Sequence, residues 1–301
     1  MRAGLLFVAA LAACSSKAAA PHSIAIEDVI AAEATGILRS NAGSAPLIDA
    51  LTNLLGTPPE CWTKLRAGVR DVLQVEEAAQ SYQVLVGVPR LELEVCARES
   101  LTKFGLELER DGELTRFRSR LGGGVARWAG DVAVIGTPDA VSSAFAAKSP
   151  AARKQWRDRL AALPRAQFAV WRTDHLFGVL FGDDALSWQL VLTKLERKPT
   201  LQLHAELRAS FADAAAASRV AAKWSAGELA TAMAPPAGLA DAIKRVPLTI
   251  DGATLSATIE DLHAFDGVQL DLPTMQQWVL QLLTGPAMTG SAGASGATPA
   301  R

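Results

Sequence analysis

The side chains that could do chemistry gather most densely in the second half of this sequence. Arg172, Asp174 and His175 lie a few residues before Asp183 and Asp184. A carboxylate beside an imidazole can orient a general base or a metal ligand, so Asp174, His175 and Asp183 define one hypothesis, a hydrolase. The competing interpretation is that Asp174 caps the free amides of a helical turn. We favour the cap, because this spacing matches no metal-ligand set.

The other polar groups predict a solvated surface and not a reaction centre. Residues 260–266 hold three carboxylates and His263, which we interpret as a solvated loop. His204 and Glu206 form an HxE pair, but no PCxxC follows, so the zinc deaminase motif is incomplete. The chain also lacks GxSxG, SxxK, HExxH, EF-hand and phosphate-binding loop motifs. We therefore predict no catalytic residue, no cofactor and no metal.

The balance of charge excludes one class of partner. The chain has 30 basic and 31 acidic side chains, for a formal net charge of -1. Binding to nucleic acid needs clustered Lys and Arg that displace counterions from phosphates, so we predict no nucleic-acid partner. Of the 301 residues, 50% are hydrophobic, which is enough to bury a core and excludes disorder of the whole chain.

The first residues indicate an export signal. Arg2 precedes an apolar run, Leu5 to Ala13, that ends in small side chains. A helix that spans a bilayer needs about 20 apolar residues, so this shorter run predicts a cleaved signal peptide, residues 1–13, and not an anchor helix. No other apolar run in the chain has the length needed to span.

The residues at the end of that run, Leu11, Ala12, Ala13 and Cys14, resemble the lipobox of bacterial lipoproteins. The resemblance implies cleavage before Cys14 and acylation of its thiol and of the new amino group. Ser15 resembles the outer-membrane sorting signal of that family. Several acyl chains would hold a protein on a membrane without a spanning helix, because each buried methylene contributes about 0.8 kcal/mol.

The location that this resemblance implies is the cell envelope, with the protein tethered by residues 14–23 to the outer membrane and facing the periplasm. The alternative is an ordinary secretory signal, cleaved near Ala13 or within residues 18–20. In the envelope we expect a non-catalytic binding or scaffolding role, with the membrane and another envelope protein as partners. Two other functions stay open: a carrier that holds a lipid or other hydrophobic ligand in a cavity between sheet and helices, and an envelope hydrolase that uses Asp174 and His175.

Export also bears on the two remaining cysteines, Cys61 and Cys96. An oxidising compartment makes two unpaired thiols the less expected outcome. The pair lacks CxxC spacing and has no histidine nearby, which argues against a metal-binding or reactive pair. We predict one structural disulfide, which stabilises by about 3 to 4 kcal/mol in the chain-entropy model.

The elements that must position these residues are mainly antiparallel strands joined by tight turns. Asp111-Gly112, Gly130-Asp131 and Asp251-Gly252 each separate two alternating runs, which is typical of two-residue hairpins. Centring the turns on these pairs predicts one partner for each hairpin: Leu106 opposite Phe117, Trp128 opposite Ala133, and Leu248 opposite Leu255. Strict alternation predicts further one-faced strands at residues 81–88 and 201–209.

Helices are predicted where apolar stripes coincide with capping residues. The predicted helices are residues 46–55, 90–103, 139–147, 212–233 and 273–283, and the remaining predicted strands are residues 29–38, 68–76, 167–173 and 188–196.

This order predicts an α+β fold, in which helices pack on one side of antiparallel one-faced sheets. It divides into two subdomains of similar plan, residues 24–148 and 149–284, with a join near residues 148–154. Residues 285–301 are small and polar, which predicts a disordered tail. The similar order of elements has two interpretations, duplication and coincidence, and the sequence favours neither.

Overall fold

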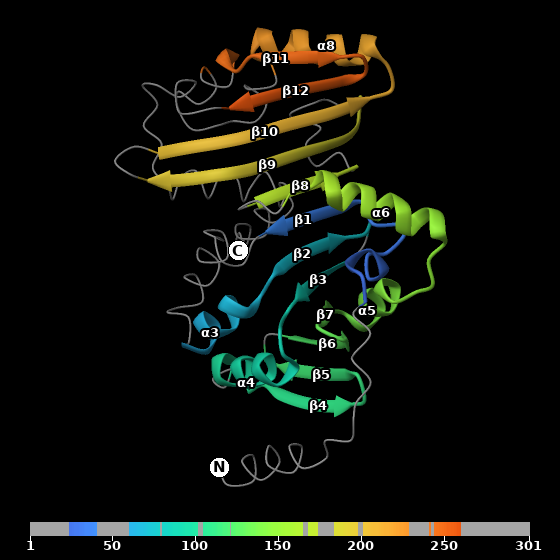
Figure 1. The fold of residues 1–301 in the computed structure, drawn as a ribbon, viewed down its shortest axis with the longest axis vertical. Helices are drawn as coiled ribbons and strands as arrows, with labels where there is room; N and C mark the ends of the chain where they lie inside the picture. Colours follow the sequence, from blue (N-terminus) through green and yellow to red (C-terminus); the bar gives the residue numbers. More distant parts are fainter. Residues whose placement is uncertain are drawn as a thin grey trace, which may run out of the picture.

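The computed structural model describes residues 24–40, 60–78, 80–101, 105–120, 122–164, 168–173, 184–197, 201–228, 241 and 244–259. Its main feature is one antiparallel sheet of twelve strands, in the order β11-β12-β10-β9-β8-β1-β2-β3-β7-β6-β5-β4 (Figure 1). The strands are β1 (Gly36–Ser40), β2 (Asp71–Glu76), β3 (Ser81–Val86), β4 (Glu107–Asp111), β5 (Leu114–Ser119), β6 (Gly122–Ala129), β7 (Val132–Gly136), β8 (Phe168–Arg172), β9 (Ala185–Arg197), β10 (Leu201–Phe211), β11 (Leu248–Asp251) and β12 (Thr254–Ile259).

Helices pack against this sheet, which confirms the predicted α+β class. They are the short 3-10 helix η1 (Ile26–Asp28) and the α-helices α3 (Glu60–Gly68), α4 (Arg90–Leu101), α5 (Pro138–Ala144), α6 (Pro150–Ala162) and α8 (Ala214–Ala226). The predictions for α4 and α5 are confirmed. Thr137 caps α5, because its hydroxyl accepts a hydrogen bond from the amide of Ala140 at 3.3 Å.

Glycine decides the register of the three predicted hairpins. In each hairpin the first of the two turn residues is a glycine with positive φ: 57° at Gly112, 64° at Gly130 and 56° at Gly252. Residues with a Cβ rarely adopt this conformation. The glycine comes first in Gly130-Asp131, so that turn falls where it is predicted, and Trp128 pairs with Ala133.

In the other two hairpins the predicted register is wrong. The glycine comes second in an Asp-Gly pair, and the turn therefore moves one residue toward the C-terminus. Asp111 and Asp251 become the last residues of their strands, paired with Leu114 and Thr254. Phe117 consequently pairs with Leu108 and not Leu106, and Leu255 pairs with Ile250 and not Leu248.

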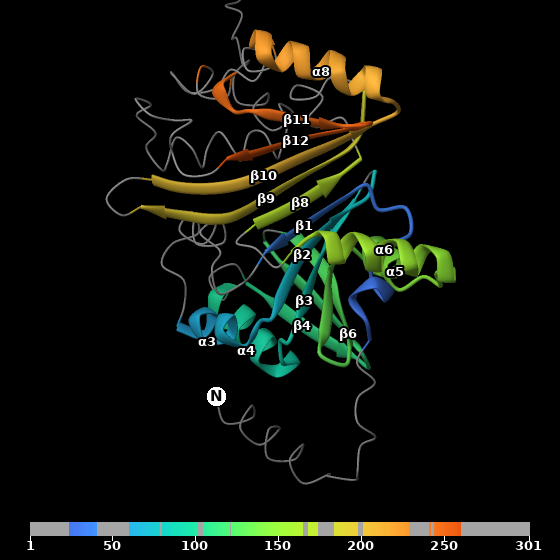
Figure 2. The same ribbon diagram turned by 45° about the horizontal axis from the view of Figure 1, so that its top comes forward.

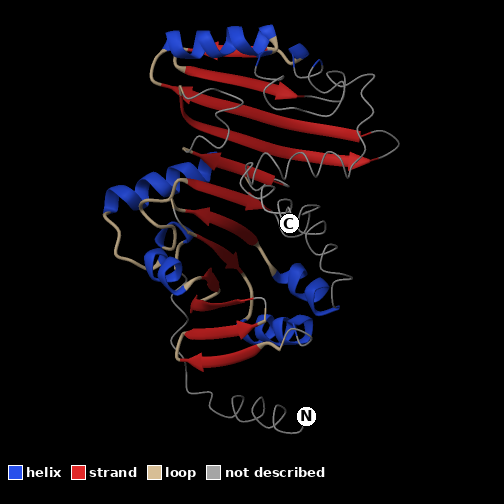
Figure 3. Cartoon of the chain, turned by 180° about the vertical axis from the view of Figure 1, so that it is seen from behind, coloured by secondary structure: helices blue, strands red, loops and turns tan. Residues whose placement is uncertain are grey.

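Helices cover both faces of the sheet at strands β3, β6 and β7, and the expectation of helices on one side is corrected there. On one face, α5 and α6 pack over a core that includes Leu73, Tyr82 and Val84, all less than 2% exposed. On the other face, Leu65 of α3 and Leu93 of α4 join a second core. Figure 1 and Figure 3 show the two helix pairs on opposite sides of the strands.

Two predicted strands begin later than expected. The first residues of the predicted strand 29–38 form an irregular segment between η1 and β1, in which Val29 and Ile30 are fully buried. Their apolar side chains therefore pack into the core instead of alternating along a strand. The predicted strand 68–76 begins at Asp71, because residues 60–68 form α3.

Residues 148–154, where the two subdomains are predicted to join, contain the start of α6. Ser149 caps the helix by accepting a hydrogen bond from the amide of Ala152, and Pro150 occupies the first turn. Trp156 is fully buried and meets Trp171 of β8 edge to face, with ring centres 5.6 Å apart. The segment is part of the core and not a linker.

In the second half, α8 begins after the side-chain cap Asp213 and ends where Gly227 adopts a φ of 76°. It is shorter than the predicted helix 212–233. Its buried stripe consists of Ala216, Ala217, Val220 and Trp224. Figure 2 shows α8 beside the β10–β12 end of the sheet, apart from α5 and α6.

The two halves share one strand plan. In the first half, β1, β2 and β3 are successive neighbours and the last strand, β7, lies beside β3; in the second, β8, β9 and β10 are neighbours and β12 lies beside β10. Among the described strands of the second half, the hairpin β4–β5 has no counterpart. Pairing of β1 with β8, with Gly36 opposite Arg172, joins both halves into one sheet. The subdomain boundary at residues 148–149 stays a prediction.

Several predictions fall outside the described residues. They are the signal peptide and tether (1–13 and 14–23), the helices 46–55 and 273–283, the loop 260–266, and the tail 285–301. Within the described parts of the chain, no helix is both long and apolar enough to cross a membrane.

Candidate functional site

The predicted disulfide is present. Cys61 of α3 and Cys96 of α4 are bonded, with Cα atoms 5.3 Å apart. Cys96 is fully buried in the core beneath α4, and Cys61 packs against the same core. The bond therefore holds two short helices together on one face of the sheet. Cys14, the predicted lipidation site, lies outside the described residues.

Removing this bond with the double substitution Cys61→Ser and Cys96→Ser is expected to lower the free energy of unfolding by about 3 to 4 kcal/mol, because the unfolded chain regains loop entropy. Denaturant titration measures the change. As a control, wild-type protein in excess reductant should have the same unfolding midpoint as the double variant. Equal midpoints for the oxidised wild type and the variant would contradict a structural role.

Asp174, His175 and Asp183, the predicted acid–imidazole group, lie outside the described residues. Their two described neighbours bind elsewhere: Arg172 pairs with Glu76 of β2 at 2.7 Å, and Asp184 pairs with Arg219 of α8 at 3.5 Å. Both contacts join elements of the fold.

The HxE pair lies on β10, as predicted. Glu206 is exposed and His204 is half-buried. Ala205 and Ala209 of the same strand are buried, so this part of β10 has the expected solvent-exposed and buried faces. Across the described ranges, no group of three or more His, Cys, Asp or Glu side chains could hold a metal ion.

Two open pockets lie at one end of the strands, and we take them as the candidate functional site. Pocket A has a volume of about 620 Å³, pocket B about 530 Å³. Pocket A lies between the start of the described chain, the end of α6 and the strand ends, and is lined by Ile24, Ala25, Ile26, Glu27, Arg39, Arg70, Val86, Asp131, Val132, Leu160, Ala161, Leu163 and Pro164. Pocket B is lined by Gly68, Arg70, Gly87, Val88, Pro89, Arg90, Trp128, Gly130 and Asp131.

An ion pair between Arg70 and Asp131 forms a wall common to both pockets. The two side chains are 58% and 43% exposed, so both can contact a partner. Their backbones are fixed: the Arg70 amide donates to the Val86 carbonyl, and the Gly87 amide donates to the Asp131 carbonyl, each at 2.8 Å. Gly87 has a φ of 86°, and a Cβ there would lie 2.8 Å from the Gly68 carbonyl oxygen, so the position requires glycine.

A buried ion pair lies behind the wall of pocket A, and its Arg39 lines the pocket. Arg39 Nε and Nη2 donate to the two carboxylate oxygens of Asp71, at 3.1 and 2.5 Å. Arg39 Nη1 donates to the carbonyls of Leu160 and Leu163, at 2.9 and 2.7 Å. These carbonyls belong to the last turn of α6, where a cation is favoured by the helix dipole. Arg39 thus attaches the end of α6 to the sheet.

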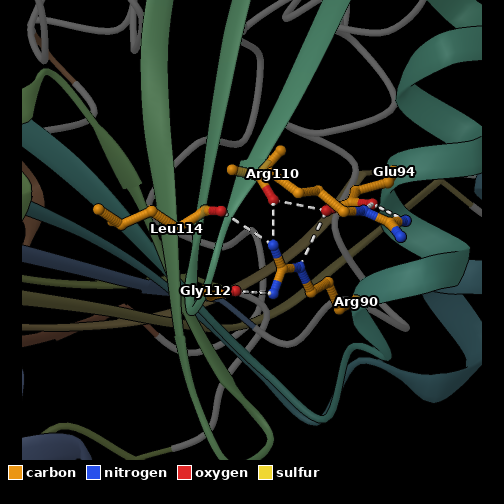
Figure 4. Close-up of polar contacts among 6 residues, drawn as sticks. Arg90, Glu94, Arg110, Gly112 and Leu114 are labelled. Atoms are coloured by element: carbon orange, nitrogen blue, oxygen red, sulfur yellow. Dashed lines mark hydrogen bonds and ion pairs between the residues drawn. The ribbon is translucent and has the colours of Figure 1, made fainter.

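A second polar cluster supports pocket B (Figure 4). Arg90 of α4 donates to the Gly112 and Leu114 carbonyls of the β4–β5 hairpin, at 2.7 and 2.9 Å. Its guanidinium also lies 5.1 Å from the ring centre of Trp128. These contacts fix the first turn of α4 to the sheet, so Arg90 has a structural role in the pocket wall.

Glu94 completes this cluster. Its carboxylate accepts hydrogen bonds from Arg90 Nε at 3.0 Å, Arg110 Nε at 2.6 Å and the Thr115 hydroxyl at 2.5 Å. Burial by itself raises the pKa of Glu94, but the hydrogen bonds from Arg110, Thr115 and Arg90 and the charge of Arg110 outweigh it, so the pKa lies below its ordinary value.

This shift predicts an acid-dependent loss of stability. The folded carboxylate binds its proton more weakly than the unfolded one, so the stabilisation is present above the ordinary pKa, about 4.5, and is lost as the pH falls through the folded pKa. The Glu94→Gln variant should be less thermally stable than the wild type at pH 7. As the pH falls below 5, its stability should decline less than that of the wild type. Parallel pH curves for the two proteins would refute this role, and exposed Glu109→Gln serves as control.

The fold and the pockets define a class: an α+β protein built on one wide antiparallel sheet, with open pockets at the strand ends. No protein-family model matches the chain, and no curated protein matches its sequence. The chain is similar in structure to TP0453 in crystal form I, with a TM-score of 0.52 and 12% identity, over 87% of this chain and 98% of that one. Crystal form III gives a TM-score of 0.47 at 12% identity, over 79% and 95%. At this identity the likeness shows the fold alone.

Proposed function

We propose that this protein is an envelope lipoprotein, cleaved before Cys14 and acylated there, that faces the periplasm from the outer membrane and acts by binding or scaffolding without catalysis of its own. The observation that carries the proposal is the pairing of cysteines. Of three cysteines, the structure joins two, Cys61 and Cys96. Cys14 is the third, at the end of the lipobox-like residues, and a disulfide is typical of exported proteins.

The binding role is supported by the shape and walls of pockets A and B. Both pockets are open, and each combines apolar walls with the exposed Arg70–Asp131 pair. A hydrophobic carrier would need an enclosed, mostly apolar cavity, which neither pocket is. In their walls, Arg39 and Arg90 are engaged in hydrogen bonds that hold the fold, so they are not poised as acids, bases or nucleophiles. Open pockets of this kind suit contact with a partner protein in the envelope.

Photo-crosslinking in the native membrane tests this role. A photoreactive residue at Ala25, exposed in the wall of pocket A, should give a discrete protein adduct, whereas the same residue at exposed Ala222 of α8 should not. The adduct should weaken when Asp131→Arg places like charges together at the wall of the pockets. Identical adducts from both positions, or none from Ala25, would contradict a binding role for pocket A.

A further inference from the structure

The first described residues, 24–28, are attached to the body differently from the residues that follow them. We call residues 24–28 the flap. Each flap residue is half-buried or exposed, whereas the next two, Val29 and Ile30, are fully buried in the core. The Tyr82 hydroxyl donates to the Val29 carbonyl at 3.1 Å and accepts from the Ala31 amide at 2.7 Å. The chain is therefore fixed in the core from Val29 onward, and the flap lies outside this fixed point.

The backbone of the flap bonds mainly to itself. The Asp28 amide donates to the Ala25 carbonyl at 2.9 Å, and the Val29 amide donates to the Ile26 carbonyl at 3.0 Å, which together form the single turn η1. Pairing of β1 with its neighbours begins only at Gly36. The flap can therefore move as one turn without breaking a hydrogen bond of the sheet.

Side chains of α6 hold the flap through exposed ion pairs. Arg153 pairs with the Asp28 carboxylate at 3.2 Å, and Arg157 pairs with Glu27 at 2.8 Å. The two arginine side chains are 50% and 66% exposed. Exposed ion pairs stabilise little, because solvent screens both charges. The half-buried side chains of Ile24 and Ile26 add partial apolar contact with the core.

The buried contact to the flap comes from Lys148, which is only 9% exposed. Its Nζ donates to the Asp28 carbonyl at 2.8 Å. It also donates to the carbonyls of Ala144 and Ala146 at the end of α5, at 2.7 and 3.2 Å. Lys148 thus joins the last residue of η1 to the end of α5, where the helix dipole favours a cation.

The closed position has a cost at this lysine. Burial lowers the pKa of Lys148; the charges of Asp28 and Glu77 act in the opposite direction, and the charge of Arg153 adds to the lowering. A lowered lysine pKa means that the charged form is less well solvated here than in water. The closed flap is therefore a balance between the hydrogen bonds of the ammonium group and its desolvation.

We propose that the flap opens and closes while the rest of the chain stays folded, and that Lys148 is the residue that holds it closed. The movement turns about residues 28 and 29, where the half-buried segment meets the buried one. Residues 24–27 line pocket A, so opening removes part of the wall and widens the pocket. This movement requires neither acylation of Cys14 nor a bound partner.

Hydrogen exchange at neutral pH tests the flap in the full-length protein with its disulfide intact. The amides of Asp28 and Val29, both bonded within η1, report on the flap. The amides of Ala31 and Thr35, which bond to β3 and β2, report on the fixed chain. At single-amide resolution, protection should be several-fold lower for the first two than for the second two. Equal protection of all four amides would overturn the proposal.

Lys148→Met tests the residue that holds the flap. The variant loses the donor to the Asp28 carbonyl, so exchange at Asp28 and Val29 should become several-fold faster, with Ala31 and Thr35 unchanged. The matched control is Lys154→Met, an exposed lysine of α6 that pairs with Asp158 of the same helix; it should leave all four amides unchanged.

The other outcomes of Lys148→Met are also decisive. Equal acceleration of all four amides would assign Lys148 to the stability of the whole fold and overturn its role at the flap, and unchanged exchange would do the same. If the variant does not fold, the double substitution Arg153→Gln and Arg157→Gln, at exposed side chains, replaces it. The amides of Asp28 and Val29 alone should then exchange faster, and unchanged exchange there would overturn the flap.

Discussion

Cys14→Ala is expected to reduce incorporation of a fatty-acid analogue into this protein to background. The acyl chains are proposed to attach at the thiol and at the amino group that cleavage before Cys14 creates, and the substitution removes the first site and prevents the second. Labelling with an alkyne fatty acid, followed by a fluorescent tag and gel analysis, measures the effect. Full labelling of the variant would show that lipid is attached elsewhere, or not through a lipobox.

The matched control uses the other cysteines. Cys61→Ser and Cys96→Ser should keep the label, because these residues pair with each other in the structure. To separate attachment from processing, the Cys14→Ala protein can be exported behind an ordinary secretory signal. It should then appear in the soluble periplasmic fraction, because several acyl chains supply the attachment, at about 0.8 kcal/mol for each buried methylene. Persistent sedimentation with membranes would point to another anchor.

The second large effect is expected at the buried Arg39–Asp71 ion pair, whose Arg39 lines pocket A. Asp71 is 1% exposed, and its removal in Asp71→Ala leaves Arg39 buried without a counter-charge. Breaking a buried pair in this way costs about 3 to 5 kcal/mol. The expected result is a large fall in the denaturant midpoint, measured by circular dichroism.

The chain offers a neighbouring pair as control. Asp131→Ala breaks the exposed Arg70–Asp131 pair and should cost less than about 1 kcal/mol, because solvent screens both charges. The double substitution Arg39→Met and Asp71→Leu should recover much of the loss, since it leaves no unpaired charge. A cost for Asp71→Ala no greater than for Asp131→Ala would contradict the role assigned to the buried pair.

Local signals in the sequence located much of the fold. The three two-residue turns were visible in the sequence as pairs of one aspartate and one glycine. The position of the glycine within each pair explains the correct register at Gly130 and the shifted registers at Gly112 and Gly252. The α6 helix was missed because four basic residues surround its buried Trp156 and Leu160, which leaves a weak apolar stripe. Its Ser149 cap and Pro150 were the signals that could have revealed it.

The candidate site could be predicted less well, for a physical reason. The disulfide was predicted from the cysteine count and the expected export alone. Arg90 and Glu94 are one helical turn apart, so the spacing alone was enough to predict their contact. Arg39 and Asp71 are far apart in sequence, and only strand pairing and the end of α6 bring them together. Pocket A likewise exists only once the strand ends, α6 and residues 24–27 meet. Pocket B exists only once the strand ends meet the start of α4. No short motif encodes either meeting.

The intact mass of the protein purified from its native envelope tests the central claim most directly. The account predicts a mass above that of residues 14–301 by several acyl chains, with the Cys61–Cys96 disulfide intact. A mass equal to unmodified polypeptide, beginning at residue 14 or anywhere else, would contradict it.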